Sequence, residues 1–77
     1  MIRLETSSRY YLCCVRQDLF GDWIVWRAWG GKTSALGRSM RLLAASEAQA
    51  LELLATVLKE RAIRGYVLVP STSSYWS

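Results

Sequence analysis

The feature that most constrains the fold of this chain is a pair of β-favouring runs joined by a short turn signal. The runs are "RYYLCCVRQ" at residues 9–17 and "WIVWRAW" at residues 23–29, both rich in aromatic and β-favouring residues. Between them, Asp18-Leu19-Phe20-Gly21 has the Asp-x-x-Gly signature of a type I turn. Two such runs with so short a connection predict an antiparallel hairpin.

A helix is predicted further along the chain. Residues 46–49, Ser-Glu-Ala-Gln, match a Ser-x-x-Gln capping box, which satisfies backbone donors at a helix start. Gly65 supplies the residue that favours a helix end. Apolar residues recur at three- and four-residue spacing and predict the buried face: Leu51, Leu54, Leu58 and Ala62.

The remaining segments complete an α+β pattern. Residues 30–37, "GGKTSALG", predict a loop, and residues 38–44 predict a third strand. "YVLVP" at residues 66–70 predicts a short edge strand. The expected fold is a small antiparallel sheet of three to four strands packed against one helix. We expect one domain over residues 1–69 and a polar C-terminal tail over residues 70–77.

Composition restricts the classes of partner. The formal net charge is +4, and eight of the ten cationic side chains are Arg. This excess fits either simple solubility or an anionic partner, and the phosphate-matching fork of Arg favours nucleic acid. No apolar run approaches the ~20 residues that span a bilayer, and residues 1–8 do not resemble a signal peptide. We therefore expect a cytoplasmic protein without a membrane partner.

The residues needed for metal or nucleophilic chemistry are scarce. The chain has no His, and its two cysteines, Cys13 and Cys14, are adjacent in a strand and should point to opposite faces. Two thiols without His cannot build a zinc site, and neither a Ser-His nor a Cys-His nucleophile is available. Asp18 and Asp22 fit the local hydrogen bonding of a turn. We expect reduced thiols, no metal, no cofactor and no catalysis.

The stretch "RAWGGKT" at residues 27–33 contains the Gly-Lys-Thr end of a phosphate-binding loop. A Walker loop needs Gly where this chain has Trp26, and it leads into a helix, whereas a strand is predicted here. Nucleotide hydrolysis is therefore excluded. The informative residue is Trp29, which lies at a strand end against two glycines.

Trp29 has cations around it in strand and loop. A flat ring flanked by cations can stack on a base or sugar while the cations neutralise phosphates. Alternatively, Trp29 plugs the end of the sheet and the cations only solvate the loop. Both interpretations remain open from the residues alone. The candidate nucleic-acid contacts are Trp29, Gly30, Arg27, Lys32, Arg38 and Arg41.

Short motifs occur along most of the chain in a particular order. They are Tyr10-Tyr11, Asp18-Leu19-Phe20-Gly21 followed by Trp23, Arg27, Trp29-Gly30, Gly37-Arg38, the capped helix and Arg64-Gly65-Tyr66. Together they resemble the WGR domain, a small module named for a Trp-Gly-Arg motif and found in poly(ADP-ribose) polymerases and short bacterial proteins. The similarity covers roughly residues 9–67, and the Asp-Leu-Phe-Gly-x-Trp turn resembles the bacterial single-domain versions most.

The resemblance implies a fold and a role for several residues. The family fold is a small antiparallel sheet packed by one helix, and family members in the polymerases contact DNA at a break. Carried over, Trp29 would stack on the DNA end and Gly30 would allow close approach. The face with Trp23 and Val25 would be interior, which leaves Trp26 more exposed. This chain has Gly31 where the motif has Arg, and Lys32 is a loose substitute.

Two functions follow as expectations. The first is a non-catalytic module that binds DNA or another nucleic acid through phosphate contacts and one stacking Trp. The second is a protein-interaction or assembly module without a nucleic-acid role. Such a module, which includes a homodimer, would use a sheet edge or an exposed Trp26.

Overall fold

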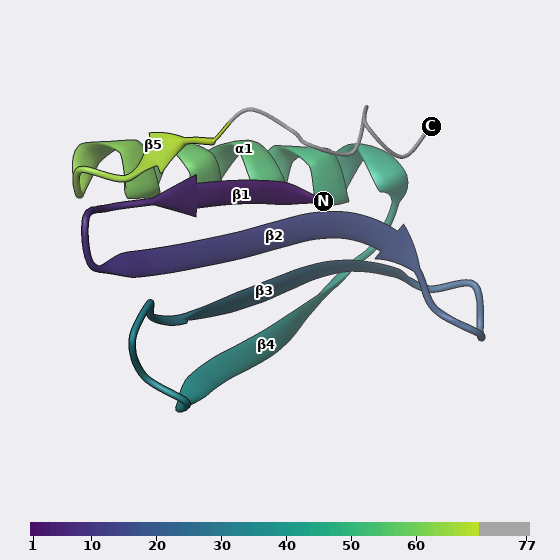
Figure 1. The fold of residues 1–77 in the computed structure, drawn as a ribbon. Helices are drawn as coiled ribbons and strands as arrows, with labels where there is room; N and C mark the ends of the chain where they lie inside the picture. The colour runs from purple at the N-terminus through teal and green to yellow at the C-terminus, as the bar shows by residue number, and fades with distance from the viewer. Residues whose placement is uncertain (70–77) are drawn as a thin grey trace, which may run out of the picture.

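The computed structural model describes residues 1–69, and they form one five-stranded antiparallel sheet covered on one face by a single helix (Figure 1). The elements are β1 (Ile2–Glu5), β2 (Arg9–Gln17), β3 (Trp23–Gly31), β4 (Gly37–Ala44), α1 (Glu47–Ile63) and β5 (Val67–Leu68). The order across the sheet is β4-β3-β2-β1-β5. The predicted α+β class is confirmed, with one or two strands more than expected. Within residues 1–69, no helix is long and apolar enough to span a membrane.

The predicted hairpin is the centre of the sheet. Strands β2 and β3 pair in register from Arg9 opposite Gly31 to Gln17 opposite Trp23. In the connecting turn, the Gly21 amide donates to the Asp18 carbonyl at 3.1 Å. Gly21 has φ +83°, a backbone conformation that side chains with a Cβ rarely adopt. The Asp-x-x-Gly signal therefore predicted both the turn between the two strands and the role of Gly21 in closing that turn.

Strand β1 was not predicted from the sequence. It has only four residues and lies between β2 and β5, with Leu4 opposite Tyr11 on one side and Leu68 on the other. Its alternating apolar and polar residues are too few to predict a strand on their own. The strand forms because β2 offers an edge and the chain returns after the helix to cover the other edge.

The core lies between the sheet and α1. Leu4, Tyr11 and Cys13 from the sheet pack with Val57 from the helix, and all four are buried. Cys14, the next residue along β2, points away from this core and is half-buried, as strand alternation predicted. Both cysteines are free, and burial raises the pKa of the Cys13 thiol.

The helix begins as the capping signal predicted, with one difference. Ser46 has an extended backbone, and its Oγ accepts from the Gln49 amide at 3.1 Å. The Gln49 side chain accepts from the Ala45 amide, one residue before the cap, so the reciprocal half of the capping box reaches one residue further back. At the other end, Gly65 has φ +91° and donates to Ala62, as expected of a helix stop.

The predicted buried face of the helix was partly wrong. Leu54 and Leu58 do pack against the core, but Leu51 is 51% exposed and Ala62 is also exposed. The buried positions are Ala50 and Val57. Apolar residues lie on most sides of this helix, so their spacing fits more than one face, and only the position of the sheet selects between them.

Tyr11 is central to the packing. Its side chain is fully buried, its ring is edge-on to Tyr66 at 6.0 Å, and the Arg61 guanidinium lies 4.4 Å from its ring centroid. Its hydroxyl is buried and has no hydrogen-bond partner among the described residues. The ring therefore stabilises the fold while the hydroxyl does not.

This arrangement predicts the effect of Tyr11→Phe. The change keeps the ring contacts and removes a buried hydroxyl whose lost hydration costs about 1–3 kcal/mol. We expect the free energy of unfolding to be unchanged or to rise by about 1 kcal/mol, whereas Tyr11→Ala should lower it by about 3–5 kcal/mol. Denaturant unfolding followed by tryptophan fluorescence measures both. A loss of more than about 1 kcal/mol for Tyr11→Phe would mean that the hydroxyl is hydrogen-bonded.

Candidate nucleic-acid interface

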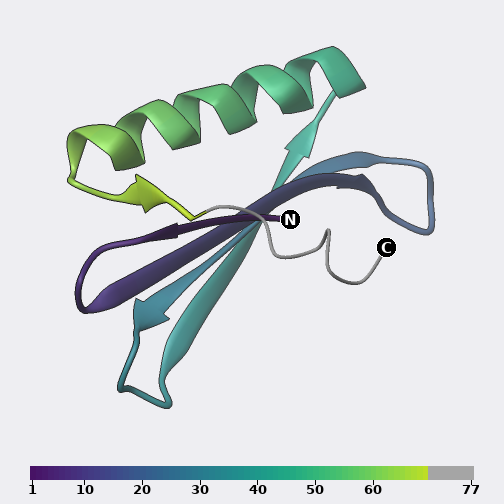
Figure 2. The ribbon, with the colours of Figure 1, turned by 45° about the horizontal axis from the view of Figure 1, so that its top comes forward.

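The loop end of the β3–β4 hairpin reaches away from the helix, which leaves that end of the sheet uncovered (Figure 2). An open hollow of about 180 Å³ lies there, at the end of β3 and the start of β4. We call it the Trp29 hollow. Its lining residues are Arg9, Trp29, Gly30, Gly31, Leu36, Gly37 and Arg38.

Trp29 forms the wall between this hollow and the core. Its ring stacks on the ring of Tyr11 with centroids 5.9 Å apart and planes 14° apart. The Arg27 guanidinium lies 5.7 Å from the Trp29 ring centroid, and its Nη2 donates to the Met40 sulfur at 2.8 Å. Trp29 is half-buried, so one part of the ring is fixed by the core while another lines the hollow.

Three of the residues predicted from the sequence lie at this hollow. Trp29, Gly30 and Arg38 all line the hollow, and Arg38 is exposed opposite Trp29 in the β3–β4 pairing. Arg27 lies against the Trp29 ring but is not part of the hollow lining. Strand alternation places Arg27 and Trp29 on one face, and the β3–β4 pairing puts Arg38 beside Trp29.

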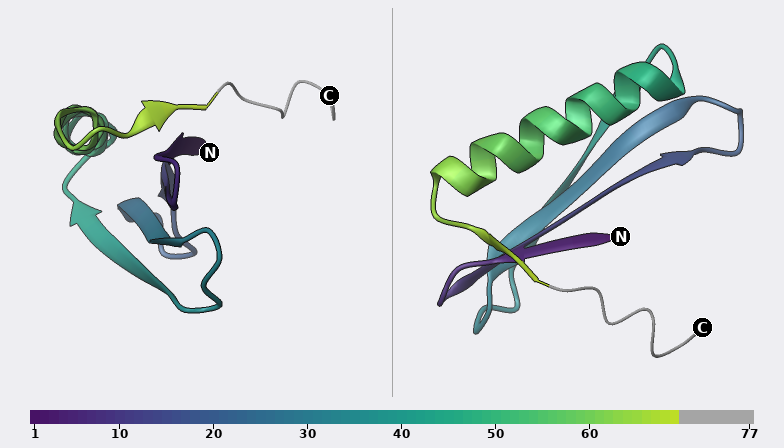
Figure 3. Two further views of the ribbon diagram at one scale, coloured as in Figure 1. Left: turned by 60° about the vertical axis from the view of Figure 1, so that its left-hand side comes forward. Right: turned by 90° about the horizontal axis from the view of Figure 1, so that it is seen from above.

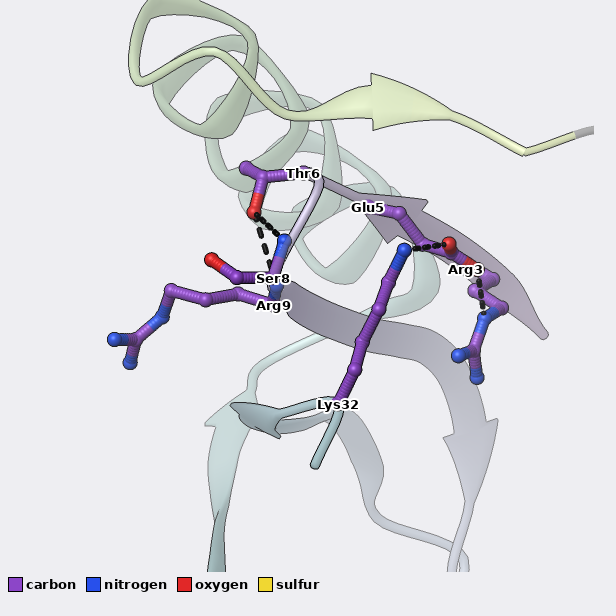
Figure 4. Close-up of polar contacts among 6 residues, drawn as sticks. All are labelled: Arg3, Glu5, Thr6, Ser8, Arg9 and Lys32. Atoms are coloured by element: carbon purple, nitrogen blue, oxygen red, sulfur yellow. Dashed lines mark hydrogen bonds and ion pairs between the residues drawn. The ribbon is translucent and has the colours of Figure 1, made fainter. Parts of the chain in front are cut away.

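Lys32 is directed elsewhere. Its Nζ lies 2.5 Å from Oε1 of Glu5 on β1, and the Arg3 Nε lies 2.6 Å from Oε2 of the same carboxylate (Figure 4). The Arg3 and Lys32 hydrogen bonds hold the pKa of Glu5 below its usual value. Lys32 therefore shares the Glu5 carboxylate with Arg3 and is directed away from the hollow, a contact that could not be foreseen while β1 was unpredicted.

Arg41 lies on the opposite face of the sheet. It pairs with Trp26 in the β3–β4 register, whereas Arg38 pairs with Trp29. Residues three apart along a strand point to opposite faces, so Arg38 and Arg41 cannot share a site of this kind. The structure therefore does not bring the predicted Arg41 to the Trp29 hollow.

Gly30 is close-packed by the protein itself. A Cβ added at Gly30 would lie 3.0 Å from the Tyr10 hydroxyl and 3.1 Å from the Leu36 carbonyl. At Gly37, the added atom would lie 2.9 Å from the same hydroxyl. The close approach expected at Gly30 is thus made by Tyr10 and the chain after β3, and it serves packing.

Arg9 is a lining residue of the hollow that sequence reasoning missed. It begins β2 and lies directly opposite Gly31, and both line the hollow. Its side chain points away from the Lys32–Glu5 pair (Figure 4). The signal was present in the sequence, because a turn centred on residues 18–22 sets the register that pairs positions 9 and 31.

The face assignment of β3 was only half right. Val25 is buried as expected, but Ile24 on the other face is buried too. Trp26 is half-buried, not exposed, and the Arg16 guanidinium lies 5.8 Å from its ring centroid. Trp26 pairs with Arg41 and lies on the face opposite Trp29.

The glycines of β3 give a matched test of this packing. Gly30→Ala should lower the free energy of unfolding by about 1–3 kcal/mol, because the new Cβ crowds a hydroxyl and a backbone carbonyl. Gly31→Ala is the control, since its Cβ would meet only ordinary contacts at 3.5 Å and beyond, and we expect a change within about 0.5 kcal/mol. Thermal or denaturant unfolding measures both, and equal effects would contradict the assigned role of Gly30.

Comparison with known proteins gives one match. The family model described as the WGR domain matches residues 3–73, which includes β1 and extends past the described residues. No curated protein and no solved structure matches the chain. Figure 3 shows the arrangement that the matched segment adopts over its described part, with the helix on one side of the sheet and β5 beside β1.

Proposed function

The chain belongs to the WGR domain family, and we propose that it is a non-catalytic, cytoplasmic module that binds DNA through the Trp29 hollow. WGR domains are modules of the nucleic-acid-binding type. The observation that carries the proposal is a half-buried indole in an open hollow, with an exposed arginine on either side of it at positions 9 and 38. Aromatic rings and cations in that arrangement are what nucleic-acid grooves use.

The proposed contact divides into two parts. The open part of Trp29 stacks on an unpaired base or sugar at a break or strand end, where a π-face is available without disrupting a duplex. Arg9 and Arg38 contact the phosphates on both sides of that nucleotide. Because Tyr11 and Arg27 already hold the indole, little side-chain entropy is lost when a base stacks on it.

Arg9 supplies the cation that the family motif places elsewhere. The resemblance leads one to expect Arg at position 31, where this chain has Gly31. Arg9 is the cross-strand neighbour of Gly31, and side chains of such pairs lie about 4.5–5.5 Å apart at Cβ. With no side chain at position 31, the guanidinium of Arg9 has room to take the place of the motif Arg in the same hollow.

A protein-interaction role remains the second candidate function. Strand β4 is an edge strand of eight residues, and Leu43 on it is 73% exposed. An open edge can pair with another chain, although Arg38 and Arg41 on the same strand oppose such pairing. The variant Leu43→Arg separates the two candidates. It should abolish self-association through the β4 edge in a light-scattering dilution series, and it should leave DNA binding unchanged.

The DNA-binding proposal predicts a specific pattern of salt dependence. Affinity for a nicked duplex, measured by fluorescence anisotropy across a salt series, should fall linearly on a log–log plot. Arg9→Gln and Arg38→Gln should each reduce the slope by about 0.9, and Arg41→Gln, on the opposite face, should leave it unchanged. Trp29→Ala should weaken binding by about 1–3 kcal/mol through lost stacking.

The Trp29→Ala variant must be checked for loss of folding, because the indole also packs on Tyr11. Circular dichroism should show whether the variant remains folded at the assay temperature, and the two Arg variants test the site independently of that outcome. Absence of binding to nicked and single-stranded oligonucleotides even at low salt would overturn the proposal. So would a slope that responds to Arg41→Gln as strongly as to Arg9→Gln.

A further inference from the structure

The turn between β2 and β3 presents two large apolar side chains directly to solvent. Leu19 is 100% exposed and Phe20 is 89% exposed, the highest values among the exposed large hydrophobic residues of the described chain. We call these two residues, with Asp18 and Asp22 on either side of them, the hairpin tip. Adjacent apolar side chains held fully in water point to a contact surface.

The tip is ordered by its own hydrogen bonds. Oδ1 of Asp18 accepts from the amides of Phe20 and Asp22, each at 2.9 Å. The backbone amide of Asp18 donates to the Asp22 carbonyl, and the Gln17 side chain donates to the Gly21 carbonyl. Since the backbone is already fixed in this conformation, the tip loses little entropy when it docks.

The Trp29 hollow is complementary to the tip in chemistry. Its apolar walls are Trp29 and Leu36, and its cations are Arg9 and Arg38. The tip offers two apolar side chains between two carboxylates, so an apolar contact would be flanked by opposite charges on both sides. The two Asp residues also make nucleic acid and anionic lipid poor partners for the tip.

The two surfaces lie at opposite ends of one hairpin. The tip follows Gln17 and precedes Trp23, while the hollow includes Arg9 and Gly31 at the far end of the same pairing (Figure 1). Nine residues of strand separate them by about 30 Å. A tip therefore cannot reach the hollow of its own chain.

From these observations we propose that the hairpin tip of one copy docks in the Trp29 hollow of a second copy. Different surfaces meet in this contact, so it is heterologous and repeats head to tail into a ring or an open chain. The proposal does not depend on nucleic-acid binding. If both occur, the tip and the nucleic acid compete for one hollow, and nucleic acid dissolves the assembly.

Two side chains and one hollow make a small interface, below the standard size of stable complexes. We expect a dissociation constant on the order of 100 μM to 1 mM at low salt. The flanking Asp–Arg pairs are exposed, so association should weaken as salt rises. Sedimentation velocity of the full chain across a concentration series measures both.

Complementary variants provide the decisive test. Phe20→Ser removes the tip and leaves the hollow intact, whereas Arg38→Glu damages the hollow and leaves the tip intact. Both positions are exposed, so both variants should fold as the wild type, which circular dichroism checks. Each variant alone should be monomeric. Mixed together, they should form a 1:1 complex that grows no further, because only one tip and one hollow are functional.

Three results would overturn the proposal. These are a wild-type chain that stays monomeric up to about 1 mM, variants that self-associate as the wild type does, and a mixture that forms no complex. The first would leave the tip to a different protein. Nucleic-acid binding of Phe20→Ser separates this proposal from the proposed function. That variant should bind DNA as tightly as the wild type, and failure of either proposal leaves the other standing.

Discussion

The stack of Tyr11 on Trp29 is the interaction on which the rest of this small domain depends. Tyr11 is fully buried against the helix, and Trp29 carries the same packing outward to the open end of the sheet. Arg61 lies over one end of this aromatic pair and Arg27 over the other. Core and hollow are therefore parts of one packed unit, and the inner wall of the hollow is held by core contacts.

The glycines at the sheet end belong to the fold more than to the site. Gly30 and Gly37 leave room for Tyr10, and a Cβ at either position would collide with its hydroxyl. Gly31 differs, since an added Cβ there would make only ordinary contacts, and Arg9 lies opposite it in the strand pairing. The Trp-Gly-Gly sequence thus combines one glycine that the packing requires with one that it does not.

Local signals predicted the parts of the fold that local chemistry controls. The Asp18 turn, the Ser46 cap and the Gly65 stop each act over a few residues, and each is present. Features that depend on distant partners were missed, including β1, which needs β2 and β5 beside it. The helix face was shifted for the same reason, because only the sheet distinguishes Leu51 from Val57.

The candidate site shows the same difference between features set by local sequence and features set by distant partners. Trp29 and Arg38 were predicted as neighbours from their closeness in sequence, and both line the hollow, whereas Lys32 pairs with Glu5 on the unpredicted strand. The positions of Arg41 and Arg9 follow from strand pairing and alternation alone. Pairing with Trp26 puts Arg41 on the face opposite the hollow, and pairing with Gly31 puts Arg9 at the hollow.

An NMR titration of ¹⁵N-labelled protein with a short nicked duplex tests most directly whether nucleic acid occupies the Trp29 hollow. We predict that the indole N–H of Trp29 and the backbone amides of Arg9, Gly31 and Arg38 shift together with added DNA. The indole N–H of Trp26, on the opposite face, should stay in place. Shifts that concentrate around Trp26 and Arg16, or no shifts at low salt, would contradict the assignment of the hollow as the binding surface.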